Sequence, residues 1–441
     1  MKPYKSNNNH YTIAMHRLLF FVSISILKIH HLDAQDIEYA RKVVEHLTSP
    51  DMYGRGYVYN GINKAAKYVI REYKKNGTVP VNGSYSQWFR VRINTFPGPV
   101  KLSINETMMK PGIDFLPDPS SSGIEGTYGL IEISLAEILH GTGNIKAQQA
   151  TQDHLLYLNL SKSDTLDELQ KKAVTDFRNW LKTGEPIRAA GVLESIDGKL
   201  TWNSSGQCFY KPWIILNNVI ETDSLTRLKI TIKNRYIPER KTRNIIGYHK
   251  GYLKPDSFIV FTAHYDHLGS LGREAVFPGA NDNASGIAML LSLMDYFAAH
   301  PPAYSLLFIA TSAEELGIMG ARYYVKNPLV ELDKMRFLIN FDLVGTGEDG
   351  IMVENASEFP HEFGTLISIN HTDSLLPAIK MRGEACNSDH CPFYLKGVPC
   401  FFIYTLGGCT SYHDLFDTSE ALSMAAFKDY AKLMIRFIEE L

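Results

Sequence analysis

Histidines and carboxylates recur through the second half of the chain at positions where side chains can do chemistry. In chain order they are His264, Asp266, Asp282, Glu314, Glu315, Asp342 and His413. If these acids gather in one place, they repel one another strongly unless a positive charge lies between them. Divalent cations supply such a charge, and imidazole combined with carboxylate suits zinc.

Each of these residues also has an ordinary explanation when it is taken alone. A histidine on a loop is usually a surface residue, and acids are common at the start of solvated helices. An aspartate after a strand is often a turn residue. Asp342 is the strongest single candidate for a functional residue. It directly follows the apolar run 337–341, and its charge needs a partner there. What favours a functional site is that all of these residues occur together in this part of the chain.

The segments that precede most of these residues are typical of buried strands. They are continuous and apolar, and they cover 258–261, 306–310, 337–341 and 398–404. Helical patterns fill the gaps between them, notably at 284–299 and 421–441. Buried strands that alternate with helices predict an α/β fold with a mainly parallel twisted sheet sandwiched by helices. The carboxyl ends of parallel strands open onto one crevice, so we expect these side chains to converge there.

The first half of the chain has a different pattern of predicted helices and strands. Residues 36–48 and 62–76 have the period of helices, the second ending before Gly77, and residues 89–93 alternate like a strand. Further on, strand-like pieces surround one helical stretch, 165–181; they cover 190–196, 213–220 and 228–232. We therefore predict a β-rich domain inserted at 95–235, between an N-terminal part at 35–94 and the main domain at 236–441.

Residues 1–34 have the pattern of a signal peptide preceded by an upstream segment. Met15-His16-Arg17 is followed by the apolar run 18–27 and then by Ala34-Gln35. This run is shorter than the roughly 20 residues that span a bilayer. An interfacial or buried helix is the alternative. We expect an exported chain, secreted or periplasmic, with no stable membrane anchor after removal of the signal.

Composition sets further bounds. The chain has 441 residues, which allows two domains or one large domain with an insertion. A formal net charge of −2 without a basic block gives nucleic-acid binding no electrostatic support. Cysteine pairing is open: Cys386–Cys391 and Cys400–Cys409 are plausible disulfides, buried free thiols are the alternative, and the odd count leaves one thiol unpaired. Nothing in the sequence indicates an oligomeric state.

The motifs around these residues resemble those of peptidase family M28, the co-catalytic zinc aminopeptidases. The matching segments are HYDHLG (264–269), GANDNASG (279–286), EELGIMG (314–320), NFD (340–342), SDH (388–390) and YH (412–413). Their order and spacing fit as well, and the resemblance covers roughly 36–95 and 236–441. Gly54-Arg55-Gly56 resembles the family's N-terminal lead-in, and the middle region loosely resembles its protease-associated insertion.

The resemblance implies a ligand set for two Zn²⁺ per chain. Asp282 would bridge the two ions. His264 and Asp342 would complete one position, and Glu315 and His413 the other.

The resemblance also implies a reaction, with peptides as substrates. A water activated by two zinc ions would hydrolyse N-terminal amino acids from peptides, and Glu314 would act as general base and acid. Asp266 would accept a hydrogen bond from the His264 ring. Tyr412 would polarise the scissile carbonyl or stabilise its oxyanion.

One segment departs from the family pattern. The residues after the last histidine usually run Thr-Pro, whereas here Asp414-Leu415-Phe416 follows, with Asp417-Thr418 retained. This departure would affect the shape of the pocket rim rather than the set of metal ligands.

Three other functions remain open at this point. A glutaminyl cyclase of similar fold would use one zinc and release ammonia, although segment 281–286 looks peptidase-like. A carboxypeptidase would need a positioned cation, and Arg273 and Arg382 lie on segments that could supply it. A non-enzymatic binding module of this fold would have lost metal ligands, whereas here the full set is present.

Overall fold

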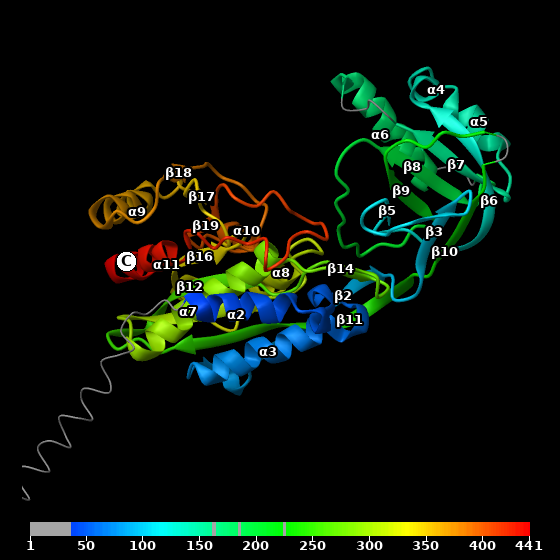
Figure 1. Ribbon diagram of the computed structural model, residues 1–441. Helices are drawn as coiled ribbons and strands as arrows, with labels where there is room; N and C mark the ends of the chain where they lie inside the picture. Colours follow the sequence, from blue (N-terminus) through cyan, green and yellow to red (C-terminus); the bar gives the residue numbers. More distant parts are fainter. Residues whose placement is uncertain (1–36, 161–164, 184–186, 224–225) are drawn as a thin grey trace, which may run out of the picture.

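The computed structural model describes residues 37–160, 165–183, 187–223 and 226–441. Figure 1 shows two lobes: the larger is built from both ends of the chain, and the smaller from its middle. The predicted signal peptide at 1–34 lies outside the described residues. Within the described ranges, no helix is long and apolar enough to cross a bilayer.

A mixed sheet forms the centre of the larger lobe. In spatial order its strands are β1 (Val79–Pro80), β11 (Arg235–His249), β15 (Tyr304–Thr311), β12 (Lys254–His264), β16 (Met335–Phe341), β19 (Cys400–Thr405), β17 (Ile351–Glu354) and β18 (Ile379–Met381), and β2 (Ser86–Thr95) pairs with β11. The central strands β15, β12, β16 and β19 run parallel. The pairs β11–β15 and β17–β19 are antiparallel. The predicted α/β sheet is confirmed, and its parallel part is its centre.

Helices cover both faces of this sheet. One face carries α2 (Ile37–Thr48), α3 (Gly61–Lys75), α7 (Gly286–Ala299), α9 (Pro360–Asp373) and α11 (Phe427–Glu440), and the other carries α8 (Met319–Lys326) and α10 (His390–Tyr394). Within β12, Phe261 packs toward the first face and Val260 toward the second. A strand buried on both faces must be apolar at every position, which explains its continuous apolar run.

Short helical turns connect these elements. They are η1 (Pro50–Arg55), η2 (Val58–Asn60), η3 (Val81–Gly83), η5 (Ala280–Ser285) and η6 (Leu332–Lys334). The last helix, expected from residue 421, begins at Phe427 because the preceding residues form turns and Met424 has a φ of 53°.

The smaller lobe leaves and rejoins the larger one through neighbouring strands. β2 and β11 pair with Thr95 opposite Arg235, so the predicted ends of the insertion fall on two residues that face each other. The sheet of the smaller lobe runs β4 (Thr107–Met109), β3 (Val100–Ile104), β10 (Leu228–Ile232), β6 (Ile124–Ser134), β7 (His154–Asn159), β8 (Gly191–Ile196), β9 (Trp213–Asn217) and β5 (Phe115–Pro117).

This lobe holds more helix than the sequence indicated. Besides α6 (Glu168–Thr183), it contains α4 (Leu135–Leu139) and α5 (Gly143–Gln149), which pack together on one face of the sheet. Ser134 and Glu137 form a capping box that starts α4. The helix is a single turn, too short for its apolar period to stand out in the sequence.

The two lobes share a hydrophobic core. The hairpin β13 (Gly269–Leu271) and β14 (Ala275–Phe277) extends from the larger lobe and buries its side chains against the smaller one. Phe277 stacks on Trp202 with ring centroids 5.1 Å apart. The segment that follows His264 is therefore packed against the insertion.

One of the two candidate disulfides forms. Cys386 and Cys391 are bonded, whereas Cys400 and Cys409 are free thiols, as is Cys208. Cys400 is buried in β19 and Cys409 contacts Ser411 instead, so the expectation of a Cys400–Cys409 pair is wrong.

Candidate metal centre

The predicted site residues lie where the central strands end. His264 is the last residue of β12, Asp342 directly follows β16, and Glu314 and Glu315 follow β15. His413 lies on the loop after β19. These strands are parallel neighbours, so their carboxyl ends share one edge of the sheet. Asp282 reaches the same edge from η5, the turn that leads into α7.

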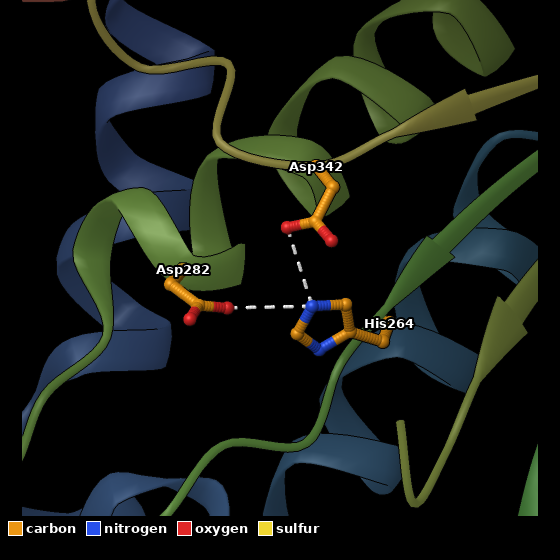
Figure 2. Close-up of side chains that lie close together, drawn as sticks. All are labelled: His264, Asp282 and Asp342. Atoms are coloured by element: carbon orange, nitrogen blue, oxygen red, sulfur yellow. Dashed lines mark hydrogen bonds and ion pairs between the residues drawn. The ribbon is translucent and has the colours of Figure 1, made fainter. Parts of the chain in front are cut away.

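The first group of ligand atoms surrounds His264. Figure 2 shows the carboxylates of Asp282 and Asp342 directed at the same nitrogen of its ring. Oδ1 of each carboxylate lies 3.3 Å from His264 Nε2. All three side chains are buried, and their ligand atoms lie within 4.8 Å of one another. This spacing suits a single metal ion.

A second group lies on the other side of Asp282. Its Oδ2 is 3.0 Å from His413 Nε2, which is also 3.3 Å from Glu315 Oε2. One oxygen of Asp282 thus faces His264 and the other faces His413, an arrangement that suits a carboxylate bridging two ions. The sequence predicted all five of these residues, and the structure brings them together.

His267 joins the second group and was not predicted. Its Nδ1 lies 2.7 Å from Glu315 Oε1, and it forms a second compact set with Asp282 and Glu315. Within the described part of the chain, its Nε2 is buried without a hydrogen-bond partner. The HYDHLG segment contained the signal, since two histidines three residues apart can face one site.

Charge within the cluster is balanced by the imidazoles. Burial alone would lower the pKa of His264, but the charge of Asp342 and bonds to both carboxylates raise this pKa well above its usual value. Burial opposes a high pKa at His413 too, yet Asp282 and Glu315 raise it to about 9. Burial favours neutral Asp282, but the histidines hold its pKa well below the usual range. The positive charge of the imidazoles therefore offsets the negative charge of the buried acids.

Glu314 lies beside this cluster and has a strongly perturbed carboxyl group. Burial raises its pKa well above the usual value, the positive charge of His264 opposes the rise, and the charge of Asp389 adds to it. Such a group takes up and returns a proton more readily than an ordinary glutamate near neutral pH. No ion pair or hydrogen bond holds its carboxylate among the described side chains.

Asp266 has a different contact from the expected one. His264 Nδ1 lies 3.2 Å from the backbone oxygen of Asp266 and 3.9 Å from its carboxylate. The carboxylate instead accepts a hydrogen bond from the amide of Glu314, at 3.2 Å. The tight turn after β12 brings the backbone oxygen closer to the ring than the side chain. Burial raises the pKa of Asp266 to about 6.

Tyr412 lies at the mouth of the site. Its side chain is 48% exposed, and its ring stacks on His413 with centroids 3.9 Å apart. Burial of the hydroxyl and then the charge of Asp282 raise its pKa far above the usual value, so the hydroxyl keeps its proton.

Other residues hold the ligands in place and had no predicted role. Ser388 donates to Asp342 Oδ2 at 2.8 Å, and Asn340 donates to Ser388. The carboxylate of Asp417 accepts from the amides of Asn281 and Asp282. These contacts fix both ends of the site.

Comparisons with known proteins agree with this arrangement. Residues 244–438 match the model of peptidase family M28. The chain is 36% identical over 187 residues to aminopeptidase YwaD of Bacillus subtilis, covering 40% of this chain and 38% of that protein. It is 27% identical over 198 residues to a probable leucine aminopeptidase of Trichophyton verrucosum, covering 43% and 55%. The chain therefore spans less than two thirds of these relatives.

Solved structures match nearly the whole chain. BSAP, a zinc aminopeptidase from Bacillus subtilis, has a TM-score of 0.64 at 19% identity, covering 91% of this chain and 94% of that one. A peptidase M28 precursor from Shewanella amazonensis has a TM-score of 0.60 at 14% identity, covering 91% and 96%. At such identities these matches show a shared fold. Residues 244–438 thus form a domain that matches peptidase family M28.

Proposed function

We propose that this protein is a metallo-aminopeptidase, a zinc-dependent exopeptidase that removes N-terminal amino acids from peptides. The observation that carries the proposal is Asp282, whose two carboxylate oxygens face two separate groups of ligands. The names of the curated relatives, among them an aminopeptidase and a probable zinc metalloprotease of Pyricularia oryzae, point the same way.

The residues fit two zinc ions. His264 and Asp342 would hold one, Glu315 and His413 the other, and Asp282 both, with His267 beside Glu315 at the second position. Mixed imidazole and carboxylate donors suit zinc. When bound, a pair of zinc ions would lower the pKa of a shared water toward neutrality and polarise the substrate carbonyl. The two groups contain three acids, and once their histidines are neutral these acids leave a negative charge that would attract the ions.

Glu314 is the proposed general base and acid. Its carboxyl group is adjacent to a ligand residue, Glu315, yet remains free of the ligand groups, so it takes a proton from the attacking water and returns it to the leaving amine. The bond from the Glu314 amide to Asp266 fixes the backbone of this turn. Asp266 thus positions the base. Tyr412, with its proton retained, would donate toward the developing oxyanion.

The acidic surroundings favour an amino end over a carboxyl end. A free α-ammonium group is attracted by a crevice of carboxylates, whereas a terminal carboxylate needs a cation. The two arginines considered for that role have partners: Arg382 donates to Glu354 at 2.6 Å, and Arg273 lies over the ring of Tyr59. These surroundings therefore favour an aminopeptidase over a carboxypeptidase.

We also propose that the chain is exported. The segment 15–35 has the order of a signal peptide. The Cys386–Cys391 disulfide is an independent reason, because disulfides persist in oxidising compartments. Secreted or periplasmic peptides are then its substrates.

The test is a panel of aminoacyl chromogenic substrates, assayed with the purified full chain. We expect hydrolysis that a chelator abolishes and zinc restores, and no cleavage of N-acetylated versions. Metal analysis should give two zinc ions per chain. One zinc ion with ammonia release from an N-terminal glutamine peptide would instead establish a cyclase. Release of C-terminal residues from N-blocked peptides would establish a carboxypeptidase.

A further inference from the structure

A segment of the insertion lies against the loop that carries His413. Lys199 donates to the backbone oxygen of Thr410 at 3.0 Å and forms an ion pair with Asp414. The Asp414 side chain is only 2% exposed. Asp414 stands where the sequence departs from the family pattern, and here it binds the insertion.

The same segment makes two contacts with His413 itself. The amide of Trp202 donates to the backbone oxygen of His413 at 2.9 Å. The His413 ring nitrogen Nδ1 lies 2.7 Å from Oδ1 of Asn203. His413 has a φ of 53°, a conformation that costs a non-glycine residue about 1 kcal/mol or more. Contacts from the insertion therefore hold both its backbone and its ring.

The Asn203 contact sets which ring nitrogen carries the proton. A side-chain amide oxygen only accepts, so Nδ1 of His413 must be the donor. The opposite nitrogen, Nε2, is then free to ligate, and it faces Asp282 and Glu315. A partner of this kind orients a ligating imidazole and raises its affinity for metal.

Residues of both lobes hold the segment that makes the Asn203–His413 contact. Trp202, next to Asn203, is buried, stacks on Phe277 of the larger lobe, and donates its indole N–H to Pro117 of the insertion at 2.9 Å. Asn203 is consequently held by a packed neighbour, although it lies near the surface.

We propose that Asn203 is a positioning residue of the metal centre, by which the docked insertion sets the affinity of the Glu315–His413 position. This inference rests on the proposed function. The His264–Asp342 position is held from within the larger lobe, by Ser388 on Asp342 and by the backbone of Asp266 on His264. The insertion should therefore act on one position and leave the other unchanged.

The experiment is a zinc titration of the full chain against a chromophoric chelator. Asn203→Leu removes the acceptor, and Asn203→Asp retains it. Gln207→Ala, an exposed change in the same segment, is the matched control. We expect two zinc ions in the unaltered protein. In Asn203→Leu one of them should bind about 10–100-fold more weakly while the other is unchanged. Asn203→Asp and Gln207→Ala should bind both normally.

A reciprocal variant and a direct spectrum complete the test. Ser388→Ala should weaken the other zinc ion. Nitrogen NMR of the zinc-loaded protein, without any substitution, should find the proton of His413 on Nδ1. A proton on Nε2 would contradict the proposal even if Asn203→Leu does not fold.

Unchanged zinc binding in Asn203→Leu, equal loss of both ions, or a proton on Nε2 would overturn the proposal. Zinc binding without aminopeptidase activity would defeat the proposed function alone. Absence of zinc binding in the unaltered protein would defeat both.

Discussion

Asp282 is the residue on which both ligand groups depend. One of its oxygens lies 3.3 Å from His264 and the other 3.0 Å from His413. Amides held by Asp417 fix its backbone, so the side chain has little freedom to swing toward one group. Removal of this carboxylate would take a donor from each of the two proposed metal positions.

We predict that Asp282→Ala loses zinc as well as activity. The matched control is Asp295→Ala, an exposed aspartate on α7. Elemental analysis of dialysed protein should find two zinc ions per chain in the control and fewer in Asp282→Ala. Two tightly held ions in Asp282→Ala would contradict the bridging role.

Glu314→Gln separates catalysis from metal binding. The amide is nearly isosteric but cannot take a proton, and Glu314 belongs to neither ligand group. We expect the variant to keep its zinc and its melting temperature while kcat falls by about 10²–10⁴-fold. Near-normal turnover on an aminoacyl chromogenic substrate would rule out Glu314 as the base.

Zinc binding should release protons. The pKa of His413 is raised to about 9 and that of His264 lies well above normal, so without metal both rings hold protons at neutral pH. Zinc needs neutral imidazoles. Apparent zinc affinity should therefore fall as the pH drops below about 9. Calorimetry in buffers of different ionisation enthalpy would count the protons, and a buffer-independent enthalpy would contradict this.

The sequence predicted which histidines and acids lie together better than it predicted the residues that support them. Residues such as Asp342 directly follow apolar strands, and the geometry of parallel sheets brings such positions together. Asn203 has no such signal, because it lies 210 positions before its partner in a segment of the other lobe. Long-range contacts of this kind depend on how two lobes pack, which no local pattern records.

At the scale of elements, Arg55 joins the end of α2 to the turn that carries Asp282. It is buried, and its guanidinium donates to the backbone oxygens of Leu47, Tyr265, Pro278, Gly279 and Asp282. Burial lowers the pKa of Arg55 to about 10, opposed by the charge of Asp282, so it stays positive at neutral pH. Its positive charge thereby offsets part of the negative charge of Asp282 and the neighbouring acids.

Arg55→Met should destabilise the larger lobe. Methionine fills part of the volume but leaves several buried carbonyl oxygens without donors, each costing about 1–3 kcal/mol. We expect the free energy of unfolding, from chemical denaturation, to fall by at least about 3 kcal/mol. Arg92→Met, an exposed change on β2, should have little effect. Equal stability of the two variants would show that Arg55 is not structural.

The predicted elements were most accurate at the centre of the sheet. The inner parts of β12 and β16 are buried on both faces, so the sequence is continuously apolar at 258–261 and 337–339, which predicts parallel strands. β11 and β17 lie farther out and pair antiparallel with their inner neighbours. The direction of these outer strands depends on the path of the chain rather than on the pattern of side chains. The sequence therefore did not show that the outer strands are antiparallel.

At the scale of the whole molecule, the two lobes behave as one unit around the site. The larger lobe supplies every predicted ligand, whereas the smaller lobe supplies contacts to His413 and most of the shared core. Trp202 is central to this packing, because it is 4% exposed and stacks on Phe277. A change there should reach the metal centre through the docking of the lobes.

We therefore predict that Trp202→Ala weakens zinc binding as well as stability. Truncation of a buried tryptophan costs about 3–5 kcal/mol, and here the loss falls between the lobes. Trp180→Ala is the matched control, since Trp180 stacks on Phe177 within the insertion and does not contact the larger lobe's hairpin. Denaturation should find both variants destabilised, and chelator competition should find zinc affinity lowered only in Trp202→Ala. Equal effects on zinc would mean that general loss of stability, rather than docking, governs the metal centre.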